Sequence, residues 1–174
     1  MDPNQGYSPD DLKRFHRETS SLDLEFVEQP MDTKHDAVLW DLPAGMRKQL
    51  AADESLLNES DALRLANRRD GEDIGACGIF VIKLMKCGGI FSAKRIADIA
   101  DIAGIQLMWG CMDESIVSIS AALHAAFSSP ATRYIDLDGS LDLARDIAKG
   151  GFELEDGKMR PSKMPGLGVQ LLED

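Results

Sequence analysis

The feature that most constrains the fold is a row of polar side chains, which recurs at intervals of 26, 25, 30, 28 and 25 residues. Most members follow a short apolar run, as Lys83 follows the run 78–82. Each interval has room for one strand, one helix and two loops. Polar groups at the carboxyl ends of successive parallel strands are where a β/α barrel places its chemistry. The row consists of Asp2, Glu28, Asp53, Lys83, Cys111 and Asp136.

Composition and charge narrow the classes of partner. Hydrophobic residues make up 44% of the 174 residues and charged residues 28%, both ordinary for a globular chain with one core. A net charge of −11 argues against nucleic acid or an anionic membrane as a partner, because little would neutralise phosphate. The same charge suits a cationic ligand or a divalent metal. No uncharged apolar stretch reaches the ~18 residues of a membrane span, and residues 1–6 do not read as a signal peptide.

The cysteines are three in number: Cys77, Cys87 and Cys111. Their count is odd, and their separations of 10 and 24 residues match no zinc-site spacing. We therefore expect reduced thiols and a cytoplasmic location.

Strand-like and helix-like segments alternate along the chain. Ser8, Pro9 and Asp11 have the residue types of a helix start with a capping box. We expect helices at 8–19, 34–40, 59–69, 89–103, 115–127 and 141–148. We expect strands at 22–27, 49–52, 79–83, 105–109 and 134–137. This β-α alternation predicts a parallel sheet.

The end of the chain has a different pattern. Residues 151–155 alternate, and Asp156-Gly157 is a turn signal followed by a returning segment, so we predict a hairpin. Residues 161–168 have loop composition. No linker or low-complexity stretch divides the chain. We therefore expect one domain, with a partial barrel over 1–150 and a hairpin with a closing segment over 151–174.

The number of strands is too small for a closed barrel. Five apolar runs read as strands, and a sixth strand would end at Asp2 without its preceding residues. A complete barrel needs eight strands and typically about 250 residues. The fold class we predict is therefore α/β, a partial (β/α) TIM-type barrel of about six β/α units with parallel strands.

Six polar motifs resemble a known family. Four of them are similar to the barrel domain of the enolase superfamily, muconate-lactonising enzyme branch: Asp2-x-Asn4-Gln5-Gly6, Val27-Glu28-Gln29-Pro30, Ala52-Asp53-Glu54-Ser55 and Lys83-Leu84-Met85-Lys86-Cys87-Gly88-Gly89. Two more resemble the dipeptide epimerases within that branch: Trp109-Gly110-Cys111-Met112-x-Glu114-Ser115 and Asp136-Leu137-Asp138-Gly139. The resemblance covers nearly the whole chain, and the order of the motifs makes it specific.

Two parts of the family pattern have no counterpart in these residues. One is the N-terminal α+β capping domain. The other is the set of first barrel strands, which carry a Lys-x-Lys motif with a second catalytic lysine. We expect the chain to correspond to the C-terminal barrel portion only, from a truncated reading frame or a fragment.

The resemblance implies a metal-assisted proton transfer. It assigns Asp2, Glu28 and Asp53 as ligands of Mg²⁺, an ion that prefers hard oxygen donors. As a Lewis acid, the ion would offset the enolate charge that develops when a dipeptide loses its Cα proton. Lys83 is the implied acid/base on one face of Cα. Partial burial and a nearby cation are expected to lower its pKa from about 10.4. Lys86 is interpreted as structural or solvated.

The last motifs imply a substrate pocket. Asp136 and Asp138 lie two apart, so on a strand they share one face. The resemblance implies that they anchor the α-ammonium of the dipeptide, and that Cys111 and Met112 line the pocket for its side chain.

The function that we expect is a Mg²⁺-dependent dipeptide epimerase, present as an incomplete fragment with impaired activity. One alternative is another activity of the same branch, cycloisomerase or o-succinylbenzoate synthase. Asp136 and Asp138 count against it, because those substrates carry no ammonium. The other alternative is a non-catalytic, metal-binding remnant. Unpaired strand edges predict self-association, as a homo-oligomer or with a missing N-terminal segment supplied in trans.

Overall fold

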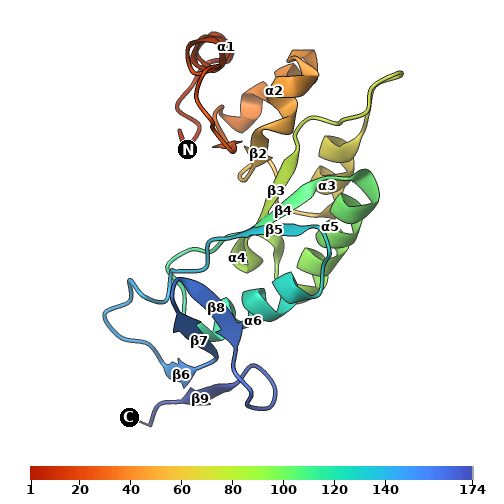
Figure 1. The fold of residues 1–174 in the computed structure, drawn as a ribbon. Helices are drawn as coiled ribbons and strands as arrows, with labels where there is room; N and C mark the ends of the chain where they lie inside the picture. Colours follow the sequence, from red (N-terminus) through yellow and green to blue (C-terminus); the bar gives the residue numbers. More distant parts are fainter. Residues whose placement is uncertain (174) are drawn as a thin grey trace.

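A five-stranded parallel sheet forms the centre of the computed structural model, which describes residues 1–173 (Figure 1). The strands lie side by side in chain order, and every neighbouring pair is parallel. The predicted α/β class with parallel strands is confirmed. The strands are β1 (Val27–Glu28), β2 (Leu50–Ala52), β3 (Ile79–Ile82), β4 (Gln106–Trp109) and β5 (Thr132–Ile135).

Helices connect the strands and cover one face of the sheet. Helix α5 packs on β3 and β4 and contacts α3 and α6 on its two sides, while α6 packs on β4 and β5. Helix α1 begins with the predicted capping box of Ser8 and Asp11. The helices are α1 (Pro9–Glu18), the 3₁₀ helix η1 (Thr33–Asp41), α2 (Ala44–Lys48), α3 (Glu59–Ala66), α4 (Leu84–Cys87), α5 (Ile90–Ala103) and α6 (Ile116–Phe127).

The two faces of the sheet belong to two separate apolar clusters. The main core lies toward the helices and takes Phe80, Ile82, Leu107 and Trp109 from the strands. The alternate residues form a smaller cluster on the opposite face, which we call the inner face: Ala51, Ile79, Val81 and Met108, with Phe26 and Tyr134 packed against them. Successive strand residues point to opposite faces. A polar residue two positions after an inner-face residue therefore continues the inner face at the carboxyl end of its strand.

The sheet is strongly curved toward its inner face. Phe26 directly precedes β1 at one edge, Tyr134 lies in β5 at the other edge, and their ring centroids are 4.9 Å apart. In a flat sheet, four strand spacings of about 4.8 Å would separate the edge strands by about 19 Å. The two rings meet only because the sheet curls around the inner cluster.

The opposite ends of the strands are fastened by a buried arginine. Arg47, on α2 just before β2, is 1% exposed. It forms two hydrogen bonds to the Glu72 carboxylate, at 2.8 and 3.0 Å. It also donates to the backbone carbonyls of Ile74 and Gly75, which precede β3. A bidentate Arg–carboxylate pair of this kind is geometrically specific.

The C-terminal region forms two small antiparallel pairs beyond β5, drawn in blue in Figure 1. Strand β7 (Phe152–Glu155) pairs with β8 (Lys158–Pro161) through the Asp156-Gly157 turn, which confirms the predicted hairpin. Strand β6 (Ala148–Gly150) pairs with β9 (Val169–Leu171), and this pair was not predicted. Phe152 and Met159 pack against the main core, and α6 contacts β6, β8 and β9.

Besides the earlier end of α3 at Ala66 and the 3₁₀ form of η1, three expected elements differ from the structure. The predicted strand 22–27 is reduced to β1, because β2 offers a partner only from Leu50 onward. The strand predicted at 134–137 is β5, which begins two residues earlier at the polar residue Thr132. The helix predicted at 141–148 is wrong. The Asp146 carboxylate instead accepts the backbone N–H groups of residues 147 and 148 and caps the start of α6 at Ile116.

Two further predictions concern single residue classes. All three cysteines are free thiols, as expected. Burial raises the pKa of Cys77 to about 12, so its thiol is inert near neutral pH. Within residues 1–173, no helix has both the length and the apolar content needed to cross a membrane.

A candidate active site at the carboxyl ends of the strands

Four of the predicted site residues continue the inner face at the carboxyl ends of neighbouring strands. Glu28 ends β1, Asp53 follows β2 and Lys83 follows β3. Asp2 lies beside β1, because Met1 accepts a hydrogen bond from the Glu28 N–H at 2.9 Å and donates to the Phe26 carbonyl. These two bonds have the pattern of a parallel strand pair.

Asp53 is the centre of the polar network. Its carboxylate is 7% exposed and accepts from two lysines. The Lys83 ammonium donates to Oδ2 at 2.6 Å, and the Lys86 ammonium donates to Oδ1. Lys86 also donates to the backbone carbonyls of Asp53 and Val81. Of the two interpretations of Lys86, the solvated one is wrong and the structural one agrees with these contacts, because its side chain is 8% exposed and its hydrogen-bond partners are protein atoms.

Gln29 links the ends of β1 and β2. Its side-chain oxygen accepts the backbone N–H groups of Asp53 and Ser55, at 2.9 and 3.1 Å. Its side-chain nitrogen donates to the Ser55 hydroxyl and the Met31 carbonyl. Its backbone φ angle is 29°, and a positive φ is uncommon for residues other than glycine. Gln29 therefore fixes Glu28, its neighbour, relative to Asp53, a role that sequence reasoning missed.

The Glu28 carboxyl is electrostatically frustrated. It makes no hydrogen bond or ion pair with any of the residues 1–173, although Glu28 is only 8% exposed. Burial, followed by the charges of Asp53 and Asp2, raises its pKa from 4.5 to about 7. Lys83 acts in the opposite direction, and Asp136 raises the pKa slightly further. One carboxyl thus feels the charges of all four neighbouring groups at the mouth of the curved sheet.

Lys83 is held as an ammonium ion. Burial lowers its pKa, but the hydrogen bond and charge of Asp53, with the charges of Glu28 and Glu54, outweigh burial and raise the pKa above its ordinary value. The expected lowering of the pKa depends on a neighbouring cation, and with carboxylates as the nearest charges the pKa is raised instead, although burial acts in the expected direction. A cation that neutralised the charges of Asp53 and Glu28 would lower the pKa of Lys83.

Two glycine positions create the space and the turn that Lys83 needs. A Cβ on Gly110, which follows β4, would lie 3.2 Å from Cε and 3.4 Å from Cγ of Lys83, so the glycine leaves room for the lysine chain. Gly88 and Gly89 have φ of 86° and 107° and separate α4 from α5. Because glycine adopts positive φ without a steric penalty, this pair allows the single turn of α4 that carries Lys86.

The predicted substrate residues lie after β4 and β5. Asp136 and Asp138 are both exposed, and burial and the charge of Asp138 raise the pKa of Asp136. The Cys111 thiol lies 3.4 Å from the Asp136 carbonyl and accepts the Gly139 N–H at 3.3 Å, so it joins the two loops. Met112 is 45% exposed on the loop after β4.

A divalent cation suits the donor set chemically. Glu28, Asp53 and Asp2 are hard oxygen donors, and mutual repulsion acts on a buried carboxyl that has no hydrogen-bonding partner. Among residues 1–173, no three His, Cys, Asp or Glu side chains are grouped closely enough to hold one ion as they stand. Both Asp53 oxygens instead carry lysine ammonium ions. The residues therefore fit Mg²⁺ by type and charge, and Asp53 has two lysines as its counter-ions in this arrangement.

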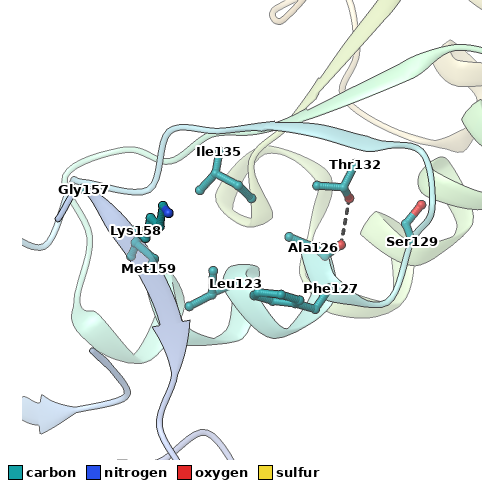
Figure 2. Close-up of a pocket in the computed structure, with 9 residues that line it drawn as sticks. All are labelled: Leu123, Ala126, Phe127, Ser129, Thr132, Ile135, Gly157, Lys158 and Met159. Carbon is teal, nitrogen blue, oxygen red and sulfur yellow. Dashed lines mark hydrogen bonds between the residues drawn. The ribbon is translucent and has the colours of Figure 1, made fainter. Parts of the chain in front are cut away.

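A separate cavity of about 510 Å³ lies away from this row, between α6, β5 and the β7–β8 hairpin (Figure 2). Figure 2 shows a mostly apolar lining and the hydrogen bond from the Thr132 hydroxyl to the Ala126 carbonyl. Among residues 1–173, no carboxyl or imidazole group lines it, and its ionisable group is Lys158. The row of strand-end residues is the better candidate site, because there a lysine lies beside several carboxylates.

Comparison with known proteins decides the family. The sequence profile described as enolase C-terminal domain-like matches residues 1–174, the full length of the chain. The chain belongs to this family.

Curated relatives within the family are named as isomerases, namely epimerases and a racemase. The chain is 57% identical over 169 residues to an L-Lys-D/L-Arg epimerase of Methylococcus capsulatus, covering 97% of this chain and 46% of the relative. It is 55% identical to a protein of the same name from Desulforapulum autotrophicum, with 98% and 46% coverage. The chain thus spans about half the length of these relatives.

Solved structures agree with the sequence comparison. The chain matches a dipeptide epimerase from Methylococcus capsulatus, complexed with Mg and the dipeptide L-Arg-D-Lys, with a TM-score of 0.91 and 58% identity. The match covers 97% of this chain and 46% of that one. An L-Ala-D/L-Glu epimerase from Bacillus subtilis matches with a TM-score of 0.84 at 30% identity. The α/β fold with its parallel five-stranded sheet is therefore similar to the C-terminal barrel domain of the enolase superfamily.

Proposed function

We propose that the chain is the C-terminal barrel portion of a Mg²⁺-dependent dipeptide epimerase, which transfers a proton at the Cα of a dipeptide. The observation that carries this proposal is the set of charges that act on one buried carboxyl, Glu28: Asp2, Asp53, Lys83 and Asp136. All belong to the row at the carboxyl ends of the strands. The names of the relatives support the reaction class.

Asp2, Glu28 and Asp53 are the residues that would hold the ion. Bound Mg²⁺ would supply Lewis-acid stabilisation for the negative charge of the enolate. Their carboxylates carry more negative charge than Lys83 and Lys86 offset, so they favour a divalent cation.

Lys83 is the proposed acid/base. Its ammonium at 2.6 Å from Asp53 Oδ2 is held by carboxylate charge, and neutralising that charge lowers its pKa toward the range of a working base. Its Nζ would take the proton from one face of Cα and return it. Residues 1–174 contain no Lys-x-Lys motif that would supply a second base for the opposite face.

Asp136 and Asp138 are the proposed anchor for the α-ammonium of the substrate. Both are exposed near the mouth, where a ligand can reach them. We further propose a dipeptide with basic side chains. The relatives at 57% and 55% identity are named for Lys and Arg substrates, and the net charge of −11 attracts cations. Cys111 and Met112 would border the substrate side chain.

We also propose that the curved sheet is part of an incomplete barrel, with 151–174 as a closing segment of the same domain. The contact of Phe26 with Tyr134 across the inner face supports barrel-like curvature. The chain covers 46% of the length of these relatives, and we assign it to their C-terminal portion. Strands β1 and β5 are the outer named strands of the sheet, and exposed strand edges favour self-association or pairing with an N-terminal segment supplied in trans. Sedimentation velocity tests this, and a monomer at all concentrations contradicts it.

The alternative functions differ in which of the predicted site residues they would use. A cycloisomerase or o-succinylbenzoate synthase would leave Asp136 and Asp138 without an ammonium to bind. A non-catalytic, metal-binding remnant needs only the carboxylates of Asp2, Glu28 and Asp53. Proton exchange separates the remnant from an enzyme.

The test is incubation of the purified full chain with Mg²⁺ and L-Lys-L-Arg in D₂O, followed by NMR and chiral analysis. We expect deuterium to enter at Cα without inversion, because only one lysine faces the carbon. L-Ala-L-Glu serves as the comparison substrate and should exchange more slowly.

Two outcomes would contradict the proposal. No exchange with any dipeptide, in a folded chain that binds Mg²⁺, supports the remnant instead. Full epimerisation by the chain alone refutes the assignment of a single base. Lys94→Met is the matched control, because Lys94 is an exposed lysine whose ammonium donates to the Ser128 hydroxyl, and neither residue belongs to the row.

A further inference from the structure

Lys86 is a buried lysine that the proposed reaction does not use. Its ammonium donates to Asp53 Oδ1, to the Asp53 carbonyl at 2.6 Å and to the Val81 carbonyl at 3.2 Å. An ammonium has three donor positions, and each has an acceptor here. A charge buried to 8% exposure is costly unless it is paired in this way. The Lys86 ammonium is therefore held by protein acceptors at all three of its donor positions.

The two lysines divide the oxygens of one carboxylate. Lys83 donates to Oδ2, and Lys86 donates to Oδ1. Lys86 lies three residues after Lys83, on the single turn of α4, so both side chains lie on one side of Asp53. Their remaining contacts differ. Lys83 makes its hydrogen bond to Asp53 alone, whereas Lys86 is also bound to two backbone carbonyls at the ends of β2 and β3.

This difference fixes which oxygen can change partner. Lys83 is 17% exposed, twice the value for Lys86, and holds Oδ2 by one bond. Lys86 is anchored to the backbone, so Oδ1 keeps its donor when Oδ2 is released. Asp53 therefore has one oxygen, Oδ2, whose single donor can be exchanged for a new partner, and one oxygen, Oδ1, whose donor is anchored to the backbone.

We propose that Lys86 is a positioning residue that reserves Oδ1 of Asp53, so that Asp53 offers a cation a single oxygen and favours Mg²⁺ over Ca²⁺. This inference rests on the proposed function, in which Asp53 is a metal ligand. Mg²⁺ requires octahedral geometry, with single oxygens at short distance. Ca²⁺ accepts six to eight oxygens and often binds both oxygens of one carboxylate.

The experiment compares the affinities of the full chain for Mg²⁺ and Ca²⁺ by isothermal titration calorimetry. The variants are Lys86→Met, which removes the donor, and Lys86→Gln, whose amide can still donate to Oδ1. Lys94→Met is the control. Contacts of this kind to a ligand typically change metal affinity about 10–100-fold. We expect Lys86→Met to shift the Mg²⁺/Ca²⁺ affinity ratio about tenfold toward Ca²⁺.

The other variants define what a structural role alone would look like. Lys86→Gln should keep the affinity ratio within about threefold of the wild type, since it preserves the hydrogen bond. Lys94→Met should leave the ratio unchanged. Equal loss of both ions in Lys86→Met and Lys86→Gln, with an unchanged ratio, overturns the proposal. Circular dichroism confirms folding, and if Lys86→Met does not fold, a ratio in Lys86→Gln shifted about tenfold overturns it as well.

The results separate this inference from the proposed function. Selective Mg²⁺ binding that depends on Lys86, without deuterium exchange into any dipeptide, supports the positioning role and refutes the reaction. Deuterium exchange into a dipeptide, together with a Mg²⁺/Ca²⁺ affinity ratio that Lys86→Met leaves unchanged, supports the reaction and refutes the positioning role. Absence of Mg²⁺ binding by the wild-type chain refutes both.

Discussion

The two ends of the row of strand-end residues are built in different ways. At the β1–β3 end, Glu28 and Asp53 are buried, and Asp53 is bound by two lysines. At the β4–β5 end, Asp136 and Asp138 are exposed. There the closest side-chain contact of a carboxylate is that of Asp138 with the Cys111 thiol at 3.9 Å.

This difference matches two different tasks. An ion needs ligands in fixed positions, and hydrogen bonds from neighbouring groups provide that rigidity. A substrate brings its own donors, so the groups that bind it must be accessible and have unused acceptor capacity. The β1–β3 end therefore has the buried carboxylates that a proposed ion site needs, although no three of these side chains are grouped around one point among residues 1–173, and the β4–β5 end has the accessible carboxylates of a recognition surface.

The largest effect is expected from Lys83→Met. Removal of a positioned acid/base group typically costs 10²–10⁴-fold in rate, so we expect deuterium exchange at Cα to fall about 10³-fold. Mg²⁺ binding should persist, because the three carboxylates remain. NMR exchange rates and calorimetry on the same samples check both statements. Exchange that survives in Lys83→Met would show that another group carries the proton.

The next effect concerns pH and the metal-free chain. The pKa of Glu28 is raised from 4.5 to about 7, so the folded state keeps this proton to higher pH than the unfolded state. Stability is therefore greatest below pH 4.5 for this group and falls as the pH rises to about 7. Solvent screens the part of the carboxyl that is not buried, so we expect a loss of about 2 kcal/mol.

Glu28→Gln should remove this pH dependence. Urea unfolding of the two proteins with a chelator present, from pH 4.5 to 8, gives the comparison. The stability of the variant relative to the wild type should increase across the window. If the difference in the free energy of unfolding between variant and wild type stays constant over this pH range, the pKa of Glu28 is not raised. The electrostatic contrast between the two ends of the row would then be contradicted.

A smaller effect is expected at the β4–β5 end. Hydrogen bonds to charged groups contribute about 1.5–3 kcal/mol, so Asp136→Asn or Asp138→Asn should raise the KM for exchange about tenfold or more. Affinity for Mg²⁺ should change less than threefold, since neither residue is a proposed ligand. Steady-state exchange kinetics and metal titration separate these quantities. A loss of metal affinity equal to the change in KM would contradict the division of the site into two ends.

The smallest effect is expected from Cys111→Ser. The serine hydroxyl can still accept the Gly139 N–H and donate to the Asp136 carbonyl, so the two loops stay joined. We expect KM and the exchange rate to stay within about threefold of the wild type. A larger change would place Cys111 in direct contact with the substrate.

Much of this architecture was predictable, because strands buried on both faces produce apolar runs that end in polar residues. The run 79–82 gave β3 and placed Lys83 at its end, and the period of 90–103 gave α5. The positions of Glu28 and Asp53 followed from the same rule. Their repetition along the chain predicted one shared edge of the sheet.

The remaining features depend on tertiary contacts that leave little pattern in the sequence. Lys86 looks like a surface lysine until α4 directs it at Asp53, and Gln29 gains its role only through Ser55. The raised pKa of Lys83 depends on which carboxylate lies nearest. The failed helix at 141–148 has a similar cause, because Asp146 binds backbone groups at the start of α6.

Arg47 has a consequence for how such a chain can diverge. Its guanidinium secures residues 72–75 at the pole of the sheet opposite the ionisable row. The residues that hold the strands together and the residues proposed to bind ligands therefore lie at opposite ends of the sheet. Loops at the reactive pole can accumulate substitutions and acquire new preferences, while the anchorage at the other pole keeps the strands aligned.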